Sequence, residues 1–227
     1  MAEVNEKIAG VSTIDASSIT SGTIDAARMY VAIDTYASLP SGVPTGTLAW
    51  CTDGLGFPVR YTGTRWVSQA THIMWTPLQA EVTTDNTGSL QIIWSALLPA
   101  GFLGEGYVIE LDQIFYKSGV TDSTELYLTI GTSGVIGGGD AVIFTNTYPS
   151  MTARMARFNP IIRIKSATSV SSSFHVSIAS SSGNAFPADV TIANISNPLY
   201  IQVRLDLSGT TDTVTLKSSQ MKITRSS

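Results

Sequence analysis

The sequence has few charged residues, one cysteine and two histidines, and each scarcity excludes a class of protein. Charged residues make up 13% of the 227 residues, and the net charge is −4. Lys and Arg are scattered, so the clustered phosphate contacts of a nucleic-acid-binding surface are not expected. Cys51 alone cannot form an internal disulfide or a cysteine-based zinc site. Long apolar runs are also missing, so no membrane insertion is expected.

Small hydroxyl residues and apolar residues are abundant instead. The chain contains 28 Ser, 28 Thr and 19 Gly, and 43% of its residues are hydrophobic. A disordered chain has low hydrophobicity and high net charge, and this chain has neither. Many hydroxyl residues and glycines favour β-structure with frequent turns. The composition therefore predicts an all-β protein with a substantial core.

A short repeat sets residues 1–33 apart from the rest. The phrase Thr-Ile-Asp-Ala occurs twice, and Ile14, Ile19 and Ile24 follow one another at an even five-residue spacing. This spacing matches neither the strand period nor the helix period, so one segment cannot bury these isoleucines against itself. Three chains wound around one axis can bury them. The alternative is a solvated N-terminal tail.

The segment from Ser17 to Arg28, SSITSGTIDAAR, resembles the short shaft repeats of bacteriophage tail-fibre and related virion proteins. This resemblance implies a homotrimer in which Ile14, Ile19 and Ile24 pack along the shaft axis. It also implies that the N-terminus docks onto another virion protein of the tail, baseplate or capsid. The first residues lack the apolar segment of a secretory signal, so we expect a virion protein made in the host cytoplasm and released by lysis.

Residues 34–70 predict a small β-meander. Two short apolar segments flank an Asp-Gly hairpin signal at Asp53, and a third segment contains Trp66. Trp50 and Trp66 are predicted to pack a small core. The pattern resembles the β-meander found between the shaft and the knob of phage fibres.

Residues 71–227 predict a β-sandwich knob. Apolar and polar residues alternate strictly over 199–207 and 124–130, which places one face toward a core and the other toward water. Nine or ten such strands, separated by turn signals, predict two packed sheets in a jelly-roll-like sandwich. The alternating segments at 214–216 and 221–223 are predicted as the last two strands.

The segment 97–104, LLPAGFLG, resembles the phrase that links early strands in the knobs of phage fibres. Its proline ends a strand by removing a hydrogen-bond donor, and its glycines permit the reversal. Phe102 and Leu103 are then predicted to close one end of the sandwich. Trp75 and Trp94 lie in the first knob strands and are predicted to be core residues.

The sequence offers no catalytic constellation. His72 and His175 are the two histidines, and they are far apart in the sequence, so they do not have the spacing of a metal site. No cofactor and no catalytic residue are predicted. Glu110 and Asp112 share one face of a strand and represent the alternative of a two-acid polysaccharide hydrolase. The glycine-rich segment 131–139 lacks the lysine and the following helix of a phosphate loop, and a flexible hairpin tip is predicted instead.

Binding residues are predicted from their face or loop position. Tyr127 and Tyr200 lie on the polar faces of strands, where each is a subunit contact or a ring for sugar binding. Asp122 and Tyr148 lie in or beside loops, where receptor contacts are expected. The predicted function is a trimeric virion fibre whose knob binds a host-surface glycan. The alternatives are a capsid decoration or head fibre without an essential receptor, and a free lectin-like carbohydrate-binding module.

Overall fold

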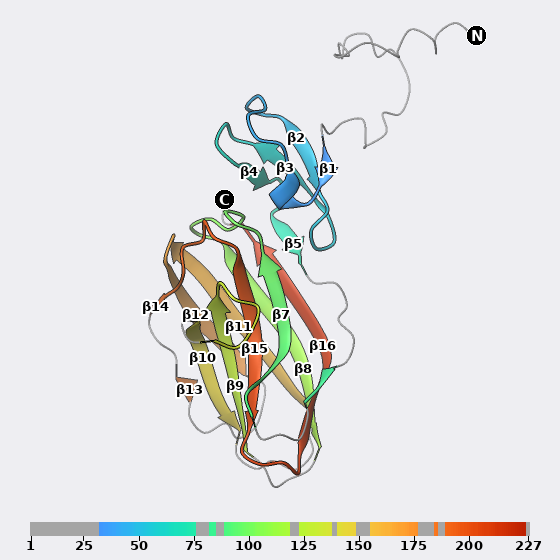
Figure 1. The fold of residues 1–227 in the computed structure, drawn as a ribbon, viewed down its shortest axis with the longest axis vertical. Helices are drawn as coiled ribbons and strands as arrows, with labels where there is room; N and C mark the ends of the chain where they lie inside the picture. Colours follow the sequence, from blue (N-terminus) through green and yellow to red (C-terminus); the bar gives the residue numbers. More distant parts are fainter. Residues whose placement is uncertain are drawn as a thin grey trace, which may run out of the picture.

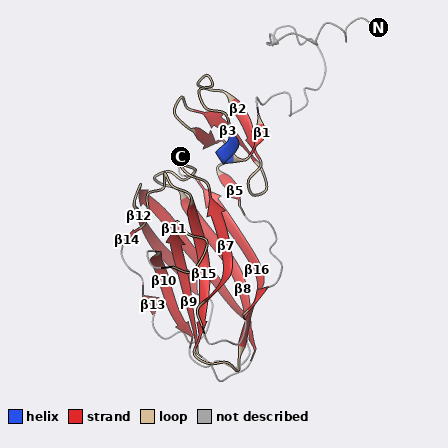
Figure 2. Ribbon diagram, viewed as in Figure 1, coloured by secondary structure: helices blue, strands red, loops and turns tan. Residues whose placement is uncertain are grey.

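The computed structural model describes residues 32–75, 82–84, 89–118, 123–137, 140–148, 155–176, 184–185 and 189–225. In these ranges the ordered elements are strands and one turn of 3-10 helix, η2 (Tyr36–Ser38) (Figure 2). Figure 1 shows a small sheet, β1 to β4, at one end of a larger two-sheet body. The fold is therefore all-β, as predicted.

The small sheet is built from the first four strands: β1 (Ile33–Asp34), β2 (Leu48–Cys51), β3 (Phe57–Tyr61) and β4 (Trp66–Ser68). The last three are consecutive antiparallel strands, which confirms the predicted β-meander. β1 pairs with β2 in parallel. Both residues of β1 are exposed, so β1 has no alternation of apolar and polar residues that would predict it. Trp66 is buried, as predicted for this small core, whereas Trp50 is half-buried.

Two sheets form the larger body, which we call the sandwich. The first contains, in spatial order, β13 (Asn184–Ala185), β10 (Ala141–Tyr148), β9 (Thr124–Gly131), β15 (Leu199–Leu207) and β7 (Gln91–Leu98). The second contains β14 (Val190–Thr191), β12 (Ser169–Val176), β11 (Met155–Ser166), β8 (Val108–Ser118), β16 (Thr213–Thr224) and β5 (His72–Met74), with β6 (Val82–Thr83) also on β16. Phe144 of the first sheet meets Phe158 of the second with ring centroids 5.7 Å apart.

The strand pairing is that of a jelly roll. The first strands of the sandwich in chain order pair with the last, and the pairing continues toward the middle of the sequence. Thus β5 and β6 pair with β16, β7 with β15, β8 with β11, and β9 with β10. A jelly roll is such a nested set of antiparallel pairs, with successive pairs placed in opposite sheets. β12, β13 and β14 extend the sheets beyond this pattern. The predicted jelly-roll-like sandwich is confirmed.

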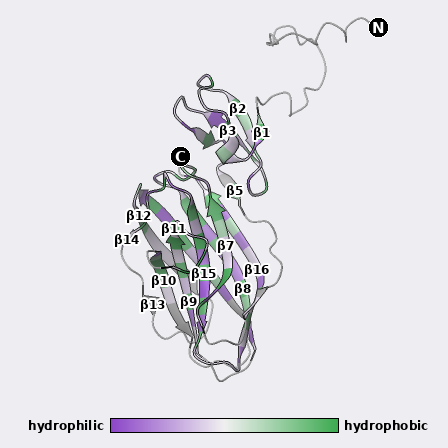
Figure 3. Cartoon of the chain, in the orientation of Figure 1, coloured by the Kyte–Doolittle hydropathy of each residue, from purple (hydrophilic) through white to green (hydrophobic). Residues whose placement is uncertain are grey.

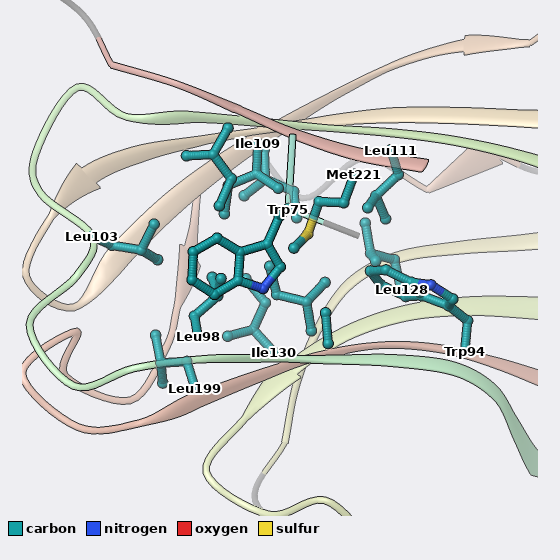
Figure 4. Packing of buried hydrophobic residues seen from close by; sticks show 14 of the residues in the cluster. Trp75, Trp94, Leu98, Leu103, Ile109, Leu111, Leu128, Ile130, Leu199 and Met221 are labelled. Carbon is teal, nitrogen blue, oxygen red and sulfur yellow. The ribbon is translucent and has the colours of Figure 1, made fainter. Parts of the chain in front are cut away.

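The core lies between the two sheets and follows the period-two pattern of the sequence. Every second residue from Leu126 to Ile130 in β9 is buried, and so is every second residue from Leu199 to Leu207 in β15. Figure 3 shows this alternation of hydrophobic and hydrophilic residues along the strands. Trp75 and Trp94 are core residues, as predicted (Figure 4). Each buried side chain of this size contributes about 2 kcal/mol by leaving water.

One predicted strand division is wrong. The alternating segments at 214–216 and 221–223 belong to a single strand, β16, which has a β-bulge between Leu216 and Ser218. In a regular strand, side chains five residues apart point to opposite faces. The bulge inserts one residue and restores the phase, so Leu216 and Met221 are both buried.

Aromatic side chains fasten the small sheet to one end of the sandwich. Phe102, in the loop after β7, lies with its ring centroid 4.7 Å from Trp75, 5.7 Å from Phe57 and 5.3 Å from Tyr36. Phe102 and Leu103 are both buried at this end, as predicted. Each aromatic pair of this kind contributes about 1 kcal/mol beyond simple burial. We call these rings the aromatic joint.

The described chain enters and leaves the sandwich at the same pole. The Arg225 amide donates to the Thr71 carbonyl at 3.0 Å, and its Nη1 donates to the Ser68 carbonyl at 2.8 Å. The end of β16 therefore lies beside the small sheet (Figure 1). The opposite pole is formed by the C-terminal ends of β8, β10 and β15.

The predicted shaft residues Ile14, Ile19 and Ile24 lie outside the described residues. The division of the chain into segments 1–33, 34–70 and 71–227 stays a prediction.

Candidate functional site

A groove of about 480 Å³ opens where the small sheet meets the sandwich. Its walls come from the chain around η2, the turn between β3 and β4, and the loop after β7. Two further sandwich loops, after β11 and after β14, complete it. The lining side chains that matter below are Tyr36, Tyr61, Arg65, Trp66, Asn194 and Ser196.

Hydrogen bonds hold the walls of the groove in place. The Trp66 indole Nε1 donates to the Pro40 carbonyl at 2.9 Å. The Tyr36 hydroxyl lies 2.8 Å from the Trp66 carbonyl oxygen and 3.2 Å from that of Gly101. One side chain thus links the small sheet to the sandwich, and each such bond contributes about 1 kcal/mol.

Arg65 supplies the charge of the groove. Among the described residues that line it, there is no Asp, Glu, Lys or His. The Arg65 guanidinium lies beside Gly104, where an added Cβ would be 3.2 Å from Nη2. Burial raises the pKa of Tyr36 to about 12, and the nearby Arg65 charge acts in the opposite direction. The groove therefore combines one cation with tyrosine and tryptophan rings.

The two carboxylates considered for hydrolysis, Glu110 and Asp112, are each paired with a cation. The Lys222 Nζ donates to the Glu110 Oε2 at 3.3 Å. The Asp112 carboxylate accepts two hydrogen bonds from the Arg157 guanidinium. The hydrogen bond from Arg157 lowers the pKa of Asp112. Each of the two carboxylates thus has a cation of a neighbouring strand beside it.

No metal site or membrane span is found in the part of the chain that the structure describes. No three side chains of His, Cys, Asp or Glu come together there to hold a metal ion. The same residues include no helix with the length and hydropathy needed to cross a membrane.

The structure places Tyr127 and Tyr200 on the outer face of the first sheet, on the neighbouring strands β9 and β15. Both are half-buried. The Tyr127 hydroxyl donates to Glu125, and this hydrogen bond raises the pKa of Tyr127 to about 12. The Tyr200 ring packs on Gly134, where an added Cβ would lie 3.0 Å from it. Both rings are thus already engaged within the chain.

The glycine-rich segment after β9 connects the antiparallel strands β9 and β10, so it is the predicted hairpin connection, and its described part folds over this outer face. The Gln202 amide lies 3.4 Å from the Ser133 carbonyl, and Asp140 forms an ion pair with Arg204. Gln202 and Arg204 alternate with the core residues of β15, yet they are only 1% and 5% exposed. The sequence pattern predicted a solvated face here, and the covering loop 132–137 corrects it.

Exposed apolar side chains are also found on this sheet and on the loop that covers it. Leu97 of β7, Val142 of β10, and Val135 and Ile136 of the covering loop are between 42% and 68% exposed. They are four of the seven large hydrophobic side chains that are exposed in the described ranges. We call these four residues the outer patch.

The remaining predicted contact residues are Asp122 and Tyr148. Asp122 lies outside the described residues. Tyr148 ends β10 and pairs with Thr124 at the start of β9. This position is at the pole away from the small sheet (Figure 1).

Sequence reasoning missed the groove residues Arg65, Asn194 and Ser196. Arg65 and Asn194 are 129 positions apart in the chain, and neither belongs to a motif of known chemistry. The one feature of the sequence that points to this site is the turn before Trp66, because it places Arg65 next to a predicted core ring. Which sandwich loop meets that turn depends on the tertiary fold.

Comparisons with known proteins give no family. No family model and no curated protein matches the chain. Among solved structures, the CBM2 module of the evolved Dit of Lactobacillus casei BL23 phage J-1 aligns at 9% identity and a TM-score of 0.35, covering 82% of this chain and 94% of that one. The protein of unknown function SO2946 from Shewanella oneidensis MR-1 aligns at 8% identity and a TM-score of 0.32, covering 91% and 97%.

The VP2 subviral particle of infectious bursal disease virus aligns at 15% identity and a TM-score of 0.27. This alignment covers 83% of the chain and 49% of VP2. All three TM-scores are below 0.5, so these similarities assign neither a family nor a function.

Proposed function

We propose that this chain is a non-enzymatic structural protein of a bacteriophage particle. It forms a homotrimeric fibre that docks onto the particle by its N-terminus, and its sandwich is a terminal knob that binds a host-surface glycan. The observation that carries this proposal is the position of the small sheet and both described chain ends at one pole of the sandwich. The sandwich then follows the small sheet along the chain and extends away from it, which suits a knob at the end of a shaft.

The outer patch supports the trimer. An exposed group of large apolar side chains on one sheet marks a candidate site of interaction. The cation of this face, Arg204, is already paired with Asp140 within the chain. A second copy of the chain is therefore the proposed partner of this face, with Tyr200 at the subunit contact. Three linked knobs would also gain avidity for a surface glycan.

Light scattering on the full chain at several concentrations tests this assembly. We expect a native mass near three times 24.1 kDa. Replacing Val135 and Val142 together by Asp places charges in the subunit contact, and the mass should then fall toward one chain on dilution. Leu55→Asp changes an equally exposed residue of the small sheet and should leave the trimer intact. A persistent monomer of the unmodified chain contradicts the fibre and favours the free lectin-like module.

Electron microscopy of particles that carry this chain, labelled with an antibody against it, tests the location. Label at the tail supports a tail fibre. Label on the capsid supports the alternative of a head fibre or decoration without an essential receptor. Particles that never carry label contradict both virion assignments.

A further inference from the structure

The groove between the small sheet and the sandwich has aromatic walls and a polar rim. Tyr36, Tyr61 and Trp66 are each less than a tenth exposed and form its apolar part. The exposed rim consists of hydroxyl, amide and guanidinium side chains: Ser41, Thr64, Arg65, Asn194 and Ser196. A pocket of mixed apolar lining with a few convergent polar groups is the usual form of a small-molecule site, and about 480 Å³ lies in the usual size range.

Arg65 has no carboxylate partner among the described residues, like Arg60, Arg163 and Arg225, but of these four arginines it is the one that lines the groove. Arg157 is paired with Asp112 and Arg204 with Asp140, whereas the Arg65 side chain forms no ion pair among the described residues. Its guanidinium lies beside the Gly104 backbone, at the side of the groove. A guanidinium in this position can bind a carboxylate or a phosphate through two parallel hydrogen bonds.

The sandwich side of the rim offers hydrogen-bonding groups that the fold holds in position. The Asn194 Oδ1 accepts from the Ser196 amide at 2.9 Å, which fixes the Asn194 side chain and leaves its Nδ2 donor for a ligand. The Tyr36 hydroxyl and the Trp66 indole hold the two walls together. A preformed site loses less conformational entropy on binding than one that must first be ordered.

We propose that this groove binds an anionic saccharide. Arg65 pairs with its carboxylate or phosphate, Asn194 and the rim hydroxyls bind its hydroxyl groups, and the ring edges of the walls contact its apolar faces. The inference rests on the proposed glycan-binding function and names both the ligand class and the site. It places the binding site at the joint with the small sheet, away from the pole that carries Tyr148.

Fluorine NMR of protein labelled with 5-fluorotryptophan tests this proposal directly. The chain has 4 Trp, so the spectrum has four signals that single Trp→Phe variants assign. Trp66 lines the groove, and Trp94 is 1% exposed in the sandwich core and serves as an internal control. The probes are trigalacturonate, glucose-6-phosphate and neutral maltotriose. We expect a saturable shift of the Trp66 signal with an acidic probe and no shift of the Trp94 signal.

Arg65→Ala should weaken this binding by about tenfold or more, because it removes a charge-assisted hydrogen-bond pair. Arg60→Ala removes an exposed arginine of β3 outside the groove and should leave the affinity unchanged. Asn194→Ala provides a second groove variant on the sandwich side. Unchanged thermal unfolding of each variant shows that a loss of binding is not a loss of folding.

The outcomes separate the sources of the anion and the two proposals. A shift with trigalacturonate alone indicates a uronic-acid carboxylate, and a shift with glucose-6-phosphate alone indicates a sugar phosphate. No Trp66 shift with either acidic probe at millimolar concentration, or equal binding by the Arg65→Ala variant, overturns the inference. The native mass is a separate measurement. A trimer that binds no acidic probe refutes the groove site alone, whereas a monomer that binds one refutes the fibre alone.

Discussion

At the scale of single residues, Gly54 shows how closely the small sheet approaches the sandwich. It follows Asp53 in the turn between β2 and β3 and has a φ of +60°. A Cβ at this position would lie 2.8 Å from the Trp75 carbonyl oxygen and 3.0 Å from that of Met74. The turn thus needs glycine for its backbone conformation and for its contact with β5.

Gly54→Ala should lower the free energy of unfolding by about 2–4 kcal/mol, since left-handed strain and a backbone clash add up. Gly42→Ala is the matched control, because Gly42 has a φ of +72° and no atom within 4 Å of an added Cβ. This control should lose about 1–2 kcal/mol from strain alone. Urea unfolding of both variants measures the difference. Equal losses would show that the contact with β5 does not constrain this turn.

A second residue-scale prediction concerns the buried ion pair under the covering loop. Asp140→Asn keeps the shape of the side chain but leaves the Arg204 charge without its counter-ion in a site that is 5% exposed. We expect a loss of about 3 kcal/mol in the free energy of unfolding. Asp112→Asn, which breaks the exposed pair with Arg157, should cost less than about 1 kcal/mol. Chemical denaturation compares the two, and similar losses would contradict the covering role of the loop.

At the scale of elements, the small sheet contains two ionisable groups that are buried in their neutral form. Burial raises the pKa of the Cys51 thiol from 9.0 to about 12 and that of Tyr36 from 10.0 to about 12. The unfolded chain therefore loses these protons at lower pH than the folded chain. Their contribution to stability is complete below about pH 9 and falls as the pH rises toward about 12.

We therefore expect the urea midpoint to decrease between about pH 9 and about pH 12. The double variant Cys51→Ala and Tyr36→Phe removes both titrating groups, so its midpoint should depend less on pH over the same interval. Midpoints measured at matched ionic strength check this. An identical pH slope in the double variant would show that other groups cause the alkaline loss.

At the scale of the whole molecule, the aromatic joint determines whether the small sheet and the sandwich unfold together. Phe102 contacts rings from both bodies, including Phe57 of β3 and Trp75 after β5. Phe102→Ala should cost about 3–5 kcal/mol and separate the two unfolding transitions, with the small sheet opening first. The Cys51 thiol, buried in the small sheet, reports this opening through its reaction rate with a thiol reagent.

Phe144→Ala removes a ring of similar burial from the contact between the two sandwich sheets. It should destabilise the sandwich without selectively exposing Cys51 at low denaturant. If Cys51 reacts equally fast in both variants, the joint does not couple the two bodies. If Phe102→Ala leaves one cooperative transition, hydrogen bonds such as that from Arg225 to Ser68 are sufficient for coupling.

The sequence by itself determined the all-β class, the meander and the sandwich, because these follow from local patterns. Period-two alternation in β9 and β15 places apolar residues toward a core whatever the partner strand is. The Asp53-Gly54 turn and the closure by Phe102 were likewise readable, since turn chemistry and strand ends depend on near neighbours.

Tertiary structure decided what depends on pairing between distant segments. The bulge in β16 is set by its register with β8, and the burial of Arg204 is set by a loop that arrives from β9. The groove exists because the turn at Arg65 meets the loop at Asn194 across 129 positions of sequence. Such meetings depend on the packing of segments that are far apart in the sequence, which no local pattern of residues encodes.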